Sequence, residues 1–133
     1  MSEPIYLGAY QIGFRMAKVY VEDHCGGASF WTLCSSGPDK DYARISVGCG
    51  SEYYYKSLAC LLHEAMEMIM GDLHVTYRKD GYFDQNASDM PHFHFHHNEF
   101  TEICARLGVF MARVEPDFKA AWQLMHPGSN TTE

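Results

Sequence analysis

The stretch Leu61–Asp72, with the sequence LLHEAMEMIMGD, is the segment around which the rest of the chain can be arranged. It continues an apolar pattern that begins slightly upstream and recurs at the three- and four-residue spacing of one helix face. The apolar positions of this pattern are Leu58, Leu61, Leu62, Ala65, Met66 and Ile69. Ser51 offers an N-cap oxygen before the helix and Gly71 a stop after it. The pattern therefore predicts a helix from Ser51 to about Met70, with one broad face in the core.

Within this helix, His63 and Glu67 are four residues apart, so their side chains lie one above the other, with Cβ atoms ~5–6 Å apart. This spacing offers two ligands to one divalent metal ion. Glu64 is rotated by about 100° from His63, too far to share the ion comfortably but close enough to reach a water on it. The residues on either side are apolar, so we expect the pair to be buried and to need a partner. A hydrogen-bonded histidine in an exposed polar stripe is the alternative.

A metal site on this helix needs a third ligand, and two candidates follow in the sequence. His74 would extend the run to HEAMEMIMGDLH, which resembles the metzincin pattern with one extra residue before the glycine. His97 ends the stretch PHFHFHH, which reads as a strand. Alternate residues of a strand share a face, so His97 points with Phe93 and Phe95 toward the core.

The remainder of the chain predicts an α+β fold. Segments 11–23, 28–34 and 43–48 read as strands separated by Gly26-Gly27 and SSGPDK turns, and their hairpin spacing predicts an antiparallel sheet. Two short strands are expected at 74–78 and 92–96. A second helix begins at Asn98, and Pro116 either breaks it or starts a last short helix through Leu124. The sheet would pack against the helix at 51–70 and the C-terminal helix.

Composition narrows the class of protein. A chain of 133 residues with 47% hydrophobic residues forms one domain, 1–133, with a loose tail at about 126–133. No window approaches the ~20 apolar residues of a membrane span, and the acidic N-terminus lacks the basic start of a secretory signal. We therefore expect a cytoplasmic protein. The net charge is −7 and basic residues are scattered, which argues against nucleic acid as a partner. Five cysteines without CxxC spacing are expected to be buried thiols.

Residues 58–105 resemble a known group of proteins. The pairing of LLHEAMEMIM with a later F-x-F-x-H-x-x-F segment (Phe93, Phe95, His97, Phe100) is similar to short, mostly phage-encoded proteins predicted to be zincin-like metallopeptidases. The resemblance implies a zincin-like fold in the host cytoplasm.

The same resemblance implies roles for individual residues. His63, Glu67 and His97 would bind one zinc ion per chain, and Glu64 would be the general base. Zinc would lower the pKa of a bound water toward ~7, and Glu64 would take its proton as the water attacks a carbonyl. The dense run of histidines leaves the choice between His96 and His97 open.

The sequence thus favours a zinc-dependent hydrolase of metallopeptidase type that acts on a peptide or protein. The alternative is a non-catalytic protein-binding module, such as a phage inhibitor of a host protein, with a structural metal or none. In that alternative Tyr53, Tyr54 and Tyr55 would be anchors for the partner. A metal held by both His74 and His97 would favour a structural role, because structural zinc sites have four protein ligands.

Overall fold

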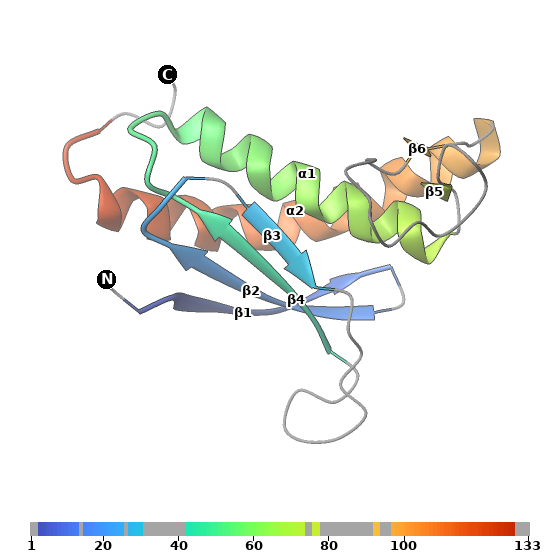
Figure 1. Ribbon diagram of the computed structural model, residues 1–133, viewed down its shortest axis with the longest axis horizontal. Coiled ribbons are helices and arrows are strands. Elements are labelled where there is room, and N and C mark those ends of the chain that lie inside the picture. Colours follow the sequence, from blue (N-terminus) through green and yellow to red (C-terminus); the bar gives the residue numbers. More distant parts are fainter. Residues whose placement is uncertain are drawn as a thin grey trace, which may run out of the picture.

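The structure, a computed structural model, describes residues 3–13, 15–25, 27–30, 42–73, 76–77, 92–93 and 97–129. These residues form two layers, a mixed sheet and a pair of helices on one of its faces (Figure 1). Helix α2 packs over β1, and helix α1 packs over β4 and β3 and against α2. The α+β class is as predicted.

The sheet has the strand order β1-β2-β4-β3. Its strands are β1 (Ile5–Ile12), β2 (Arg15–Glu22), β3 (Gly27–Phe30) and β4 (Tyr42–Gly48). Strand β4 lies between β2 and β3, parallel to the first and antiparallel to the second. The prediction of an all-antiparallel sheet was therefore wrong at the β2–β4 pair, because hairpin spacing along the chain does not fix which strands become neighbours.

The first strand was not predicted. Gly13, with a φ of 67°, makes the turn of a β1–β2 hairpin inside the segment that had been assigned to one strand. This left-handed conformation favours glycine. The alternating pattern of the central strands was informative, since one face of β2 and β4 supplies core residues at a period of two. These are Ala17, Val19, Val21, Ala43, Ile45 and Val47.

Helix α1 (Tyr54–Asp72) is the helix predicted from the apolar pattern. Leu61, Ala65 and Ile69 are buried as expected, Leu58 and Met66 pack partly against the core, and Leu62 is 37% exposed. The predicted ends were slightly wrong. The Ser51 hydroxyl accepts a hydrogen bond from the Tyr53 backbone N–H in the turn before the helix. At the other end, Gly71 lies inside the last turn and Leu73 is the C-cap.

Helix α2 (His97–Met125) is continuous, with Pro116 inside it. Both readings of Pro116, as a break or as a new start, were therefore wrong. Pro116 and Ala112, whose carbonyl loses its helical donor, are exposed. Val114 and Phe118 on either side are fully buried and hold the helix to the core. Packing thus offsets the missing hydrogen bond.

The two predicted short strands are confirmed over fewer residues. Strand β5 (Thr76–Tyr77) pairs antiparallel with β6 (His92–Phe93). His74, His94 and His96 lie outside the described residues. His126, the first residue of the predicted loose tail, stacks on Trp122 and lies 2.6 Å from the Cys49 carbonyl through Nε2.

Long-range polar contacts fix α1 and α2 in place. At the start of α1, the Tyr54 hydroxyl donates a hydrogen bond to Glu115 of α2 (2.7 Å). At the end of α1, Asp72 accepts two hydrogen bonds from Arg15 of β2, at 3.0 and 2.6 Å. The hydroxyl of Tyr10 in β1 donates a hydrogen bond to Asp117 of α2 (2.5 Å). Burial and these acidic partners raise the pKa of both tyrosines.

The cysteines differ in exposure. Cys49 is fully buried, and burial raises its pKa to about 12. Cys60 is half-buried, whereas Cys25 and Cys104 are exposed, so the expectation of buried thiols was wrong for those two. Neither of the two described helices has the length and apolar character needed to cross a membrane.

Candidate metal centre

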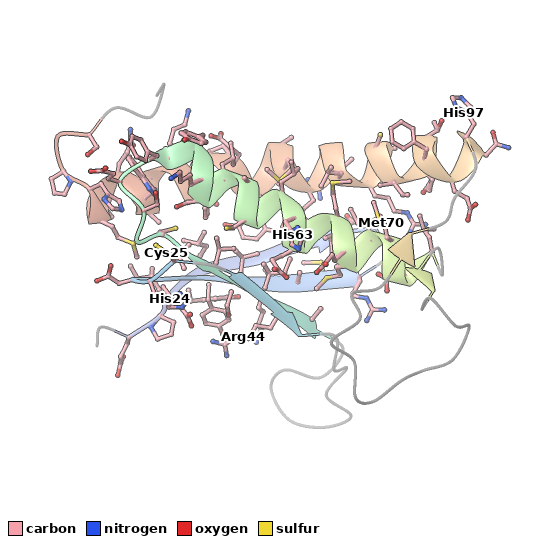
Figure 2. The ribbon with its side chains drawn as sticks, turned by 45° about the horizontal axis from the view of Figure 1, so that its top comes forward. His24, Cys25, Arg44, His63, Met70 and His97 are labelled. Atoms are coloured by element: carbon pink, nitrogen blue, oxygen red, sulfur yellow. The ribbon has the colours of Figure 1, made fainter. Side chains whose placement is uncertain are left out.

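The middle of α1 brings together His63, Glu64 and Glu67, which the sequence predicted as metal ligands and general base. His63 Nε2 lies 3.2 Å from a Glu67 carboxylate oxygen, as the four-residue spacing predicts. Figure 2 shows His63 midway along the helix. The side chain of His63 is 58% exposed and that of Glu67 26% exposed. The expectation of a buried pair was therefore wrong, because the apolar neighbours in the sequence turn toward the core while His63 faces solvent.

Glu64 has the opposite environment. It is only 7% exposed, and it is the one carboxylate among the buried residues of α1. Its carboxylate belongs to the same group as the other two side chains, since one ligand atom from each of His63, Glu64 and Glu67 lies within 4.8 Å of the others. The sequence argument placed Glu64 too far round the helix to share an ion. A glutamate side chain is long enough to bring its carboxylate back toward its neighbours.

The charges in this group favour a cation. Two carboxylates within 4.8 Å of each other repel unless positive charge lies between them. In the part of the chain that the structure describes, no side chain donates a hydrogen bond to Glu64. One imidazole nitrogen and two carboxylate oxygens are donors that zinc accepts. The residues present therefore fit a divalent metal ion.

His97, the expected third ligand, is not part of the group. It is the first residue of α2 and is exposed. Figure 2 shows it at the N-terminal end of α2, well separated from His63. The alternatives His74 and His96 lie outside the described residues. The structure thus brings His63, Glu64 and Glu67 together and leaves His97 apart.

One contact that positions α1 was not predicted from the sequence. The Arg15–Asp72 pair anchors the C-terminal end of α1 to the sheet, and the Asp72 side chain is 3% exposed. The two residues are 57 positions apart, so no local spacing could have revealed the contact.

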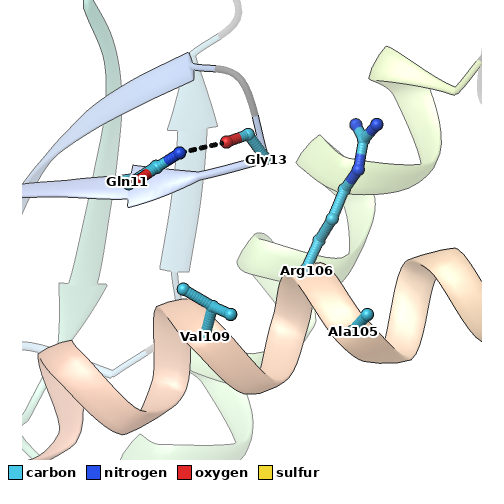
Figure 3. Close-up of a pocket in the computed structure, with 5 residues that line it drawn as sticks. All are labelled: Gln11, Gly13, Ala105, Arg106 and Val109. Atoms are coloured by element: carbon cyan, nitrogen blue, oxygen red, sulfur yellow. Dashed lines mark hydrogen bonds between the residues drawn. The ribbon is translucent and has the colours of Figure 1, made fainter.

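A shallow hollow of about 180 Å³ lies elsewhere, between the β1–β2 turn and α2 (Figure 3). Its lining residues are Gln11, Gly13, Ala105, Arg106 and Val109. None of them lies on α1, so this hollow is separate from the His63–Glu64–Glu67 group.

No family model, curated protein or solved structure matches the chain. The group on α1 is therefore the feature from which function can be argued.

Proposed function

We propose that this protein is a zinc-dependent hydrolase of metallopeptidase type, in which His63 and Glu67 bind the ion and Glu64 is the general base. The observation that supports the proposal is the gathering of three ligand atoms within 4.8 Å on one helix. His97 is left out of the proposed ligand set because it lies at the start of α2, apart from this group.

Each residue has a defined task in this proposal. His63 and Glu67 hold the ion at the exposed side of α1. When bound, zinc acts as a Lewis acid and makes water nucleophilic near neutral pH. Glu64, largely packed against the protein beside these two side chains, would be the general base that takes up a proton. The substrate would be a peptide or protein, and the group attacked would be a carbonyl.

The exposure of the His63 side chain, at 58%, favours an open site over a structural one. Closed structural zinc sites have four protein ligands, whereas among the described residues three ligand atoms gather here, all from one helix. His63 and Glu67 alone would leave coordination positions for water and substrate on an ion held here. Catalysis needs such open positions.

Elemental analysis of protein purified without a histidine tag tests the proposal. Wild type should contain about one zinc ion per chain, and His63→Ala and Glu67→Ala should lose it. His97→Ala is the matched control and should keep it. A wild-type protein that folds but holds no metal after zinc is added would refute the proposal. If zinc is present, Glu64→Gln should abolish hydrolysis in a peptide-library screen.

A protein-binding module is the second candidate. Tyr53 and Tyr55 are 42% and 54% exposed, and their rings lie 5.9 Å apart at the start of α1. Exposed tyrosines are common anchors in interfaces. Tyr54, the third expected anchor, is buried and belongs to the core. A metal-free wild type would favour this candidate.

A further inference from the structure

We propose that Glu64 is itself a ligand, so that the resting metal site consists of His63, Glu64 and Glu67 from a single helix. This inference rests on the proposed metal site and changes its ligand set.

The first argument is distance. Zinc binds nitrogen and oxygen ligands at roughly 2.0–2.2 Å, so two ligand atoms on one ion lie roughly 3–4 Å apart. The atoms of His63, Glu64 and Glu67 are already within 4.8 Å of one another. Small changes in side-chain torsions would bring all three into range, with no movement of the helix.

The second argument is the burial of Glu64. The Glu64 residue is 7% exposed, so its side chain is largely packed against protein, and a carboxylate in such a position is favoured by a compensating positive charge. Asp72, whose side chain is 3% exposed at the C-terminal end of α1, accepts hydrogen bonds from Arg15. Glu64 has none among the described side chains and lies beside Glu67, another acid. A bound dication would supply the missing positive charge.

The third argument is the number of ligands. Zinc sites in proteins usually have at least three protein ligands, and His63 and Glu67 are two. The expected third, His97, is separated from them. In the described part of the chain, Glu64 is the residue whose ligand atom completes the group.

This role is compatible with general base catalysis. A carboxylate has two oxygens, so one can bind the ion while the other accepts a proton. The two carboxylates would balance the charge of a divalent ion.

Zinc affinity, measured by competition with a chelating dye, tests the inference. Glu64→Gln should weaken zinc binding at least about 100-fold, more than the loss of a residue that only supports a ligand. Glu52→Gln, an exposed glutamate just before α1, is the matched control and should bind zinc as wild type does. His97→Ala should also be unchanged. Thermal unfolding of the metal-free variants checks that each is folded.

Cobalt substitution separates a ligand from a nearby charge. At saturating cobalt, loss of a ligand should shift the visible absorption bands of Glu64→Gln, whereas loss of a neighbouring charge would leave them in place. Unshifted bands, or zinc affinity equal to wild type, would overturn the inference while the proposed function stands. Absence of metal binding by wild type would instead overturn the proposed function itself.

Discussion

The two ends of α1 and its middle differ in whether the acidic side chains there have a hydrogen-bond donor. At the N-terminal end, Tyr54 donates a hydrogen bond to Glu115, and at the C-terminal end Arg15 makes two hydrogen bonds to Asp72. In the middle, Glu64 is buried without a donor among the described side chains and lies beside Glu67.

The paired acids at the ends of α1 stabilise the fold, whereas Glu64 in the middle has no such pairing among the described side chains. Buried polar groups that serve the fold are paired, because an unpaired one costs the full desolvation of that group. A cation between the carboxylates of Glu64 and Glu67 would remove their repulsion. The contrast predicts that removing a partner is costly at the ends of α1, whereas altering Glu64 costs little.

The largest effect is expected at the C-terminal end. Arg15→Ala leaves Asp72, with a side chain 3% exposed, without its charged donor. The free energy of unfolding should fall by about 3–5 kcal/mol, as for other broken buried ion pairs. Urea unfolding followed by circular dichroism measures the change.

The double variant Arg15→Ala/Asp72→Ala is the control. It removes both charges and should recover part of the lost stability. If the destabilising effect of Asp72→Ala simply adds to that of Arg15→Ala in the double variant, the two residues are not coupled. The ion pair would then not be what fixes the C-terminal end of α1.

A smaller effect is expected at the N-terminal end. Tyr54→Phe removes the hydroxyl that donates to Glu115 and should lower the free energy of unfolding by about 1.5–3 kcal/mol, the range for hydrogen bonds to charged groups. Lys119, 3.4 Å from Glu115, keeps that carboxylate partly paired and places the effect below that of Arg15→Ala.

Tyr55→Phe is the matched control for this variant. Tyr55 is 54% exposed, so loss of its hydroxyl should change stability by less than about 0.5 kcal/mol. Equal effects of the two substitutions would show that the Tyr54–Glu115 bond contributes nothing specific.

The sequence was most informative where structure is local. The apolar spacing predicted α1, and the four-residue separation predicted the contact between His63 and Glu67. Both follow from the geometry of a single helix. The face that Glu64 occupies could not be predicted, because its burial depends on what packs around the helix.

Long-range arrangement was harder to predict. The parallel β2–β4 pair aligns Ala17 with Ala43, and only the assembled sheet selects that neighbour. The separation of His97 from His63 has the same origin. A strand pattern indicates which residues share a face, but it does not specify which helix that face meets.

The smallest effect, and the sharpest contrast with the helix ends, is expected for Glu64→Gln in the presence of a chelator. The substitution removes the repulsion between two carboxylates and leaves no described donor unpaired, so stability should rise or stay within about 1 kcal/mol of wild type. With zinc the order should reverse. Wild type gains about 2.7 kcal/mol at a zinc concentration 100 times its Kd, and the variant, which binds more weakly, gains less. A loss of stability in chelator as large as that of Tyr54→Phe would mean that Glu64 is held by a structural partner. The middle of α1 would then resemble its ends, and the burial of Glu64 would no longer favour a metal ion.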